Sequence, residues 1–220
     1  MLYGFGDSFT MGCYEDDYVD KTYLDFIGEE FNQEVVNKAR YGMSFEDINA
    51  TVTKNLVNIR EGDIVIYGGT ILDRIMFPVP YHQVVDYHGT GSGEYSITGI
   101  NPNSLDYFFK LHDEKKRKQM GYQYTLSEYL KLITDEYDLL KGPWSRAYRR
   151  FYDDMFLHWE AYFKSINVPF YWWKFHWWDA AGDKNRGSCG HWNMYYHEVF
   201  AGILGSYMKS NDSGCLKYWF

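Results

Sequence analysis

The sequence predicts an α/β protein, a three-layer α/β/α sandwich in which helices cover both faces of a parallel sheet. Short apolar segments alternate along the chain with amphipathic segments at helical spacing. One β-branched run, Asp63 to Gly69, has no polar face, as expected of a strand covered on both sides. At 220 residues the chain suits one core, so we predict a single domain over 1–220 with an insertion at about 76–143.

The first third of the chain predicts the order β-α-β. Met1 to Phe5 is a short apolar strand that runs directly into a Gly-Asp-Ser turn. Apolar or small residues then recur at helical spacing: Leu24, Ile27, Gly28 and Phe31. Glu34 to Asn37 reads as the second strand, so the two strands are joined by a helix, as in a parallel sheet.

A second helix and a third strand follow. Ser44 and Asp47 are spaced like a capping box at a helix start. An apolar stripe continues this helix toward Gly62: Ile48, Val52, Leu56 and Ile59. The run from Asp63 to Gly69 is then the third strand and ends in two glycines.

The rest of the chain interrupts this alternation and then resumes it. The predicted insertion contains two prolines, a Gly/Ser patch, a charge run and a helical stretch from Thr125 to Leu140. A long amphipathic helix, Ser145 to Ile166, precedes a strand from Val168 to Phe175, and Tyr195 to Met208 forms the last helix. Ligands of such sheets bind outside the carboxyl ends of the strands, where the candidate site residues fall.

Composition narrows the function classes. The formal net charge is -8 and the pI is near 5.3, which disfavours nucleic acid as a partner. Three cysteines without a CxxC spacing fit neither a disulfide framework nor a zinc module. No apolar run approaches the roughly 20 residues that span a bilayer, and no basic and apolar leader precedes the first motif. We therefore expect a soluble protein without a membrane partner or a visible secretion signal.

Ser8 is the first candidate for chemistry. It follows the first strand immediately, so its hydroxyl and its backbone N–H are expected at the carboxyl edge of the sheet. A nucleophile fits this position, and so does a simple helix cap.

Two further positions follow the second and third strands. Gly42 can present a backbone N–H to an oxyanion, or it can be an ordinary turn glycine. Thr70 carries a hydroxyl able to donate toward a bound carbonyl oxygen, or it can be a cap or turn residue. Asp73 and Arg74 lie just beyond and form either a substrate-binding pair or an exposed surface pair.

Two histidines lie near the start of the last helix. His191 follows the last strand and can accept the proton of Ser8, because an imidazole titrates near neutral pH. His197 is expected to be structural. The six-residue step between them does not place both on one helical face, which argues against a metal pair.

Four separated blocks resemble the SGNH (GDSL-like) hydrolase superfamily. They are Gly6-Asp7-Ser8-Phe9-Thr10, Gly42, Gly68-Gly69-Thr70, and His191-x-Asn193-x-x-x-His197. The family typically shows His-Pro-Asn followed by Gly-His in the last block. The resemblance frames nearly the whole chain except the insertion and implies a flavodoxin-like sheet.

The resemblance also implies roles for these residues. Ser8 would be the nucleophile, His191 the general base, and the N–H groups of Ser8 and Gly42 would form the oxyanion hole. The reaction would be ester hydrolysis through an acyl-enzyme, on lipids, acetylated sugars or other small esters, without a metal or organic cofactor.

Two positions depart from the family pattern. The oxyanion asparagine of the third block falls at Thr70, and loss of one such donor typically costs ~10²–10³ in rate. The aspartate three residues before the histidine falls at Ser188. Asp183 or Asp179 in the upstream loop can take over its role, a backbone carbonyl can do so in a Ser-His dyad, or the site is degenerate.

Aromatic residues near this edge are candidates for substrate binding. Trp177 and Trp178 lie past the end of the predicted strand and can stack on a sugar ring. Trp192 stands where the family usually has proline and is expected to line the pocket. Trp172 and Trp173 lie within the strand and are expected in the core, and His176 is a reserve candidate for the base.

The sequence therefore predicts a serine esterase or carbohydrate O-deacetylase that acts on a small-molecule or glycan ester. The alternative is a catalytically impaired SGNH-fold protein that serves as a carbohydrate-binding or structural module. A third hypothesis is acyl transfer to an acceptor other than water. The acidic charge balance, the compact insertion and the lack of a visible secretion signal are similar to those of hydrolase-like proteins encoded in phage genomes. This similarity implies a cytoplasmic or virion-associated location.

Overall fold

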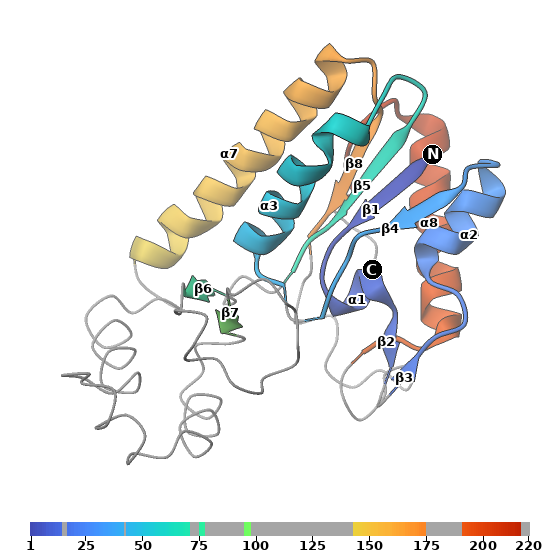
Figure 1. Cartoon of the computed structure of the whole chain (residues 1–220), viewed down its shortest axis with the longest axis horizontal. Coiled ribbons are helices and arrows are strands. Elements are labelled where there is room, and N and C mark those ends of the chain that lie inside the picture. Colours follow the sequence, from blue (N-terminus) through green and yellow to red (C-terminus); the bar gives the residue numbers. More distant parts are fainter. Residues whose placement is uncertain are drawn as a thin grey trace.

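The structure is a computed structural model, and it describes residues 1–14, 17–41, 43–70, 75–77, 95–97, 143–174 and 191–216. Five strands form one parallel sheet: β1 (Leu2–Phe5), β4 (Val35–Asn37), β5 (Ile64–Gly68), β8 (Phe170–Trp173) and β9 (Gly214–Leu216). Their order across the sheet is β4-β1-β5-β8-β9 (Figure 1). By position in the chain this is the doubly wound order 2-1-3-4-5. The predicted α/β class with a parallel sheet is confirmed.

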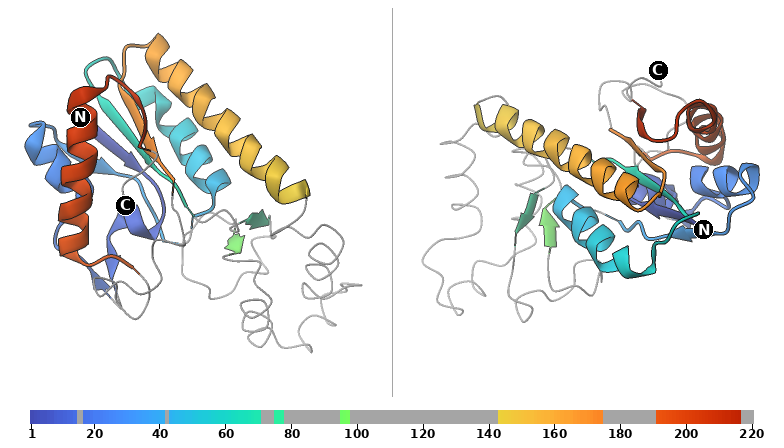
Figure 2. Two further views of the ribbon diagram at one scale, coloured as in Figure 1. Left: turned by 180° about the vertical axis from the view of Figure 1, so that it is seen from behind. Right: turned by 90° about the horizontal axis from the view of Figure 1, so that it is seen from above.

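Helices lie on both faces of the sheet. On one face lie α3 (Phe45–Asn55) and α7 (Pro143–Ser165), and on the other lie α2 (Tyr23–Glu30) and α8 (Met194–Ser210) (Figures 1 and 2). Successive strand residues point to opposite faces, so each strand contributes to both cores. In β8, for example, Trp172 packs in the core with α3 and α7, and Trp173 packs in the core with α2 and α8. Three layers result.

The predicted start of the second helix is seen in atomic detail. Ser44 is the N-cap of α3, its Oγ accepts a hydrogen bond from Asp47 N at 3.2 Å, and Ser44 N donates to Asp47 Oδ2 at 3.1 Å. This reciprocal pair satisfies donors that the first helical turn leaves open. The helix ends at Asn55 and continues as the 3₁₀ turn η1 (Leu56–Asn58), so the predicted apolar stripe extends past the α-helix.

Several short elements are not predicted by the sequence pattern. They are α1 (Ser8–Met11), the antiparallel pair β2 (Cys13–Tyr14) and β3 (Asp17–Tyr18), the antiparallel pair β6 (Ile75–Phe77) and β7 (Tyr95–Ile97), and β9. Most of the predicted insertion at about 76–143, with its helix from Thr125 to Leu140, lies outside the described residues. Among the described helices, none is both long enough and apolar enough to cross a membrane.

Candidate active site

The topology of the sheet places a crevice beside Ser8. From β1 the chain moves to β4 on one side, and it then crosses to β5 on the other side of β1. In a doubly wound sheet, ligands bind at such a switch point, outside the carboxyl ends of the strands. Ser8 follows β1 and Thr70 follows β5, so both lie at this point of the fold.

The turn after β1 fixes Ser8 at the start of a short helix. Asp7 is the N-cap of α1, and its Oδ1 accepts from Phe9 N at 3.0 Å. Gly12 ends α1 with φ 86°, a left-handed conformation that suits glycine, and its N–H donates to Ser8 O at 3.1 Å. Because the first N–H groups of a helix have no partner within it, α1 does not use the N–H of Ser8.

The structure brings Ser8 and His191 together across 183 positions of sequence. His191 Nε2 lies 2.8 Å from Ser8 Oγ, within hydrogen-bond distance. Ser8 is fully buried and His191 is 9% exposed. A hydroxyl held against an imidazole nitrogen at this distance is what general-base activation of a serine requires.

Thr70 has a different partner from the one expected. Its Oγ1 donates to Asp7 Oδ2 at 2.7 Å, between two fully or almost fully buried residues. A hydroxyl has one proton to donate, so in this arrangement Thr70 cannot also donate to a substrate oxyanion. Its role is corrected accordingly: Thr70 positions the Asp7 carboxylate, which in turn caps α1 and holds the Ser8 turn to the end of β5.

A buried hydrogen-bond network supports the other side of α1. Thr10 Oγ1 lies 3.1 Å from Tyr23 Oη, and Trp173 Nε1 donates to the same Tyr23 Oη at 3.2 Å. An indole N–H only donates, so Tyr23 Oη accepts from Trp173, and either hydroxyl can be the donor between Tyr23 and Thr10. Burial raises the pKa of Tyr23, so this phenol keeps its proton. The network therefore fixes α1 to α2 and β8.

Two glycines of the motif blocks make room for Thr10. A Cβ at Gly6 or at Gly68 would lie 2.2 Å from Thr10 Oγ1, closer than any real contact allows. Gly6 follows β1 and Gly68 ends β5, so both strands approach the same threonine. The glycines thus permit the close packing of α1 against the sheet edge.

The loop after β4 is held against the Ser8 turn. Asn37 Nδ2 donates to Thr10 O at 3.0 Å, Lys38 N to Gly4 O at 2.8 Å, and Arg40 N to Gly6 O at 3.3 Å. Tyr41 follows, and its ring centroid lies 6.1 Å from that of His191. Tyr41 was not among the predicted site residues, although its place in the loop after the second strand was a signal that it would reach the site edge.

His197 lies apart from the Ser8 and His191 pair, in line with the structural role expected of it. It is fully buried, and its Nδ1 accepts from Tyr23 N at 3.2 Å. Its ring stacks on that of Tyr23 at a centroid distance of 6.1 Å. Burial lowers the pKa of His197 to about 4, so the imidazole is neutral at neutral pH.

Trp192 lies in the core and not at the surface of the site. Its side chain is fully buried, and its ring centroid lies 5.5 Å from those of Trp173 and Phe9 and 5.2 Å from that of Phe200. The prediction that it contacts substrate is corrected: the apolar indole gains more by filling the core beneath His191 than by facing solvent. Trp172 and Trp173 are buried, as expected.

The remaining candidates lie outside the described residues. They are Gly42, Asp73, Arg74, His176, Trp177, Trp178, Asp179, Asp183 and Ser188. Among the described residues, no group of three or more His, Cys, Asp or Glu side chains is arranged to hold a metal ion.

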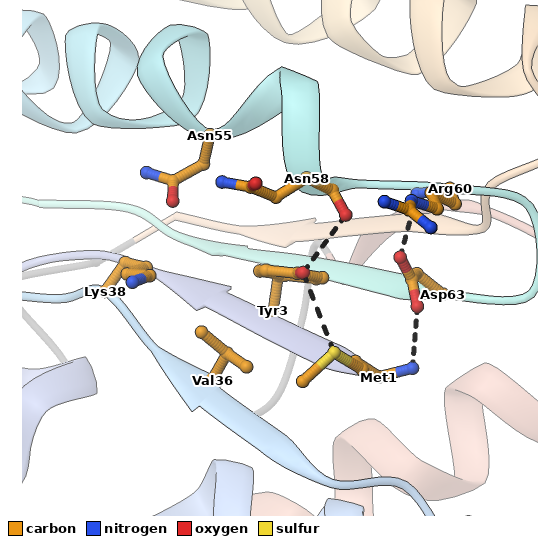
Figure 3. A pocket seen from close by; sticks show the side chains of 8 residues that line it. All are labelled: Met1, Tyr3, Val36, Lys38, Asn55, Asn58, Arg60 and Asp63. Carbon is orange, nitrogen blue, oxygen red and sulfur yellow. Dashed lines mark hydrogen bonds and ion pairs between the residues drawn. The ribbon is translucent and has the colours of Figure 1, made fainter.

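A pocket of about 490 Å³ lies on a different part of the surface, and none of the candidate residues lines it (Figure 3). It lies between the end of α3 and strands β1 and β4, and some of its polar groups are bonded to one another. Tyr3 Oη donates to Asn58 O at 3.2 Å, and the amino group of Met1 pairs with Asp63 at 2.7 Å. These contacts stabilise the fold at the amino end of β1.

Comparisons of the chain with family models, with curated proteins and with solved structures find no match. The inference of function therefore depends on the chemistry of the Ser8 site.

Proposed function

We propose that this protein is a serine ester hydrolase of the SGNH type, with Ser8 as nucleophile and His191 as general base. The observation that supports this best is the 2.8 Å hydrogen bond between His191 Nε2 and Ser8 Oγ at the carboxyl edge of the parallel sheet. The strand order, which is that of flavodoxin-like sheets, and the order of the four sequence blocks support it further.

The proposed reaction has two steps. Ser8 Oγ attacks the ester carbonyl carbon while His191 Nε2 takes the hydroxyl proton, and the N–H of Ser8 donates to the resulting oxyanion. Collapse of this intermediate breaks the bond to the alcohol, which leaves with the proton from His191. Water then attacks the acyl-enzyme with His191 again as base, and the carboxylic acid and free Ser8 are released.

The buried Asp7 and Thr70 pair has a positioning role in this proposal. Asp7 Oδ1 holds Phe9 N and Asp7 Oδ2 holds Thr70 Oγ1, so one carboxylate joins α1 to the end of β5. Catalysis by oriented dipoles requires that the donors do not move as charge develops. The pair keeps the backbone at Ser8 in one orientation.

Ester hydrolysis tests the proposal with a matched pair of serine variants. Ser8→Ala removes the nucleophile, and Ser206→Ala removes an exposed serine hydroxyl on α8. With p-nitrophenyl acetate we expect wild type and Ser206→Ala to turn over at the same rate and Ser8→Ala to be at background. Equal turnover by Ser8→Ala and wild type would refute the proposal.

The geometry of Thr70 favours a second candidate, a carbohydrate-binding module that has kept the fold and lost turnover. Because the Thr70 hydroxyl donates to Asp7, the block Gly68-Gly69-Thr70 offers no side-chain donor to an oxyanion in this arrangement. Loss of one such donor costs ~10²–10³ in rate. Glycan binding that survives Ser8→Ala, with no hydrolysis of any ester by wild type, would favour this candidate.

A further inference from the structure

Tyr41 is the described aromatic side chain that combines contact with His191 and exposure to solvent. Its ring centroid lies 6.1 Å from the imidazole at an interplanar angle of 43°, and the residue is 50% exposed. Phe9 also contacts the imidazole, at 5.0 Å, but it is 4% exposed. A bound substrate can therefore reach the ring of Tyr41, whereas Phe9 only supports His191 from the core.

The backbone next to Tyr41 is fixed relative to Ser8. Arg40 N donates to Gly6 O, two residues before Ser8, and Ala39 N donates to Asn37 Oδ1 at 3.0 Å. The side chain of Asn37 in turn donates to Thr10 O in α1. A ring carried on this loop is pre-positioned, so a contact with substrate costs little additional ordering.

The chemistry of His191 indicates which part of an ester lies beside Tyr41. After taking the Ser8 proton, the imidazole must give it to the oxygen of the departing alcohol, which therefore lies within hydrogen-bond reach of Nε2. An exposed ring beside this imidazole, such as that of Tyr41, is therefore within reach of the alcohol part of the ester. The acyl group extends from the carbonyl carbon in another direction.

We infer that Tyr41 is a specificity-determining residue that contacts the alcohol part of the substrate, and that this alcohol is a sugar ring. A tyrosine offers a flat apolar face and a hydroxyl, and a sugar offers a face of C–H groups with hydroxyls at its edge. This inference rests on the proposed function, because it needs Ser8 and His191 to cleave an ester. It selects the sugar esters among the esters that the sequence predicts, and it adds the residue that recognises the sugar.

Esters that share an acetyl group and differ in the alcohol test the inference. Glucose pentaacetate, phenyl acetate and ethyl acetate all give the same acetyl-enzyme on Ser8. In Tyr41→Ala we expect kcat/KM to fall about five- to tenfold for the sugar ester, within the range of aromatic ring contacts, and to change less than twofold for ethyl acetate. The rate of deacylation, measured after a burst, should not change, because the alcohol has left.

Matched variants separate this role from a structural one. Tyr41→Phe keeps the ring and should retain most of the preference for the sugar ester, and Tyr162→Ala, an exposed tyrosine of α7, should behave as wild type. Equal losses on all three esters, or no loss on any, would overturn the inference. A loss confined to phenyl acetate would overturn the assignment to sugars.

The failure of the proposed function gives a different result. If wild type hydrolyses none of the three esters, both the proposed function and the role of Tyr41 are refuted. If wild type hydrolyses them through Ser8 and Tyr41→Ala shows the wild-type ratio of rates, only the role of Tyr41 is refuted.

Discussion

His191 and His197 lie on two sides of the start of α8 and have different surroundings. His191 keeps 9% of its surface exposed and directs Nε2 at Ser8 Oγ, at the carboxyl edge of the sheet. His197 is fully buried between α8 and α2, and its Nδ1 accepts the N–H of Tyr23. The residue type is the same, and the partner of each ring sets its role: one imidazole can exchange a proton with a hydroxyl, and the other serves as a neutral acceptor in the core.

The largest expected effect separates the two histidines by activity. His191→Gln should lower kcat by about 10²–10⁴, the usual contribution of a general base, and change the unfolding free energy by about 1 kcal/mol or less. His197→Asn should lower the unfolding free energy by about 1–3 kcal/mol and kcat by less than tenfold. Ester hydrolysis and urea unfolding of both variants measure this. A large loss of kcat in His197→Asn, with only a loss of stability in His191→Gln, would contradict these roles.

The pH dependence of stability should report His197. In the unfolded chain a histidine has a pKa near 6.5, whereas burial lowers the pKa of folded His197 to about 4. The unfolded state therefore binds the proton first as the pH falls. The stability that depends on neutral His197 is fully present above about pH 6.5. It is lost as the pH falls from 6.5 to 4, by an amount on the order of 3 kcal/mol.

His197→Asn is the control for this decline, because the Asn Oδ1 can still accept from Tyr23 N. Asp25 and His191 are the charged or titratable groups that act on His197 among the described residues, and both remain in the variant. The difference in unfolding free energy between wild type and variant should shrink from pH 7.5 to pH 4. A constant difference across this range would contradict the buried neutral state.

Thr70→Val tests the positioning role of the Thr70 and Asp7 pair and leaves both histidines unchanged. Valine has the shape of threonine and removes the hydrogen bond that Thr70 donates to the buried Asp7 Oδ2, so we expect a loss of about 1–3 kcal/mol in stability and a fall in kcat. Thr70→Ser keeps the hydroxyl and should restore both. If Thr70→Val lowers kcat and leaves stability unchanged, Thr70 acts on the substrate directly and the positioning role is wrong.

The smallest effect comes from α8 itself. Gly202 lies in this helix, and a Cβ added there would meet no atom of another element within 4 Å, so Gly202→Ala should raise the unfolding free energy by about 0.5–1 kcal/mol, as alanine favours the helix. Activity should not change, because Gly202 is exposed and takes no part in the Ser8 and His191 pair. Thermal unfolding measures the gain, and the variant also provides a stabilised background for His197→Asn. A loss of stability would show that this part of α8 is packed more closely.

Regular patterns in the sequence predicted much of the fold. The capping box at Ser44 and Asp47 placed the start of α3, and the apolar run at Trp172 and Trp173 placed a central strand. The edge strand β9 was not predicted, because its three residues, Gly214 to Leu216, are too few to show the two-residue period of a strand.

The site was predictable in its residue types and less so in its contacts. Ser8 and His191 could be nominated because each follows a strand, and all carboxyl ends of a parallel sheet share one edge. The bond from Thr70 to Asp7 joins residues 63 positions apart, and the sequence contains no signal for it. The burial of Trp192 likewise depends on Trp173 and Phe200, whose packing is decided by the tertiary fold.

Covalent labelling with a small fluorophosphonate tests the central claim most directly, because only an activated serine displaces fluoride at neutral pH. Peptide mass spectrometry of the labelled protein should find the phosphonyl group on Ser8 alone, with no label in Ser8→Ala and much slower labelling in His191→Gln. Label on another serine, or undiminished labelling of Ser8→Ala, would contradict the account of this site.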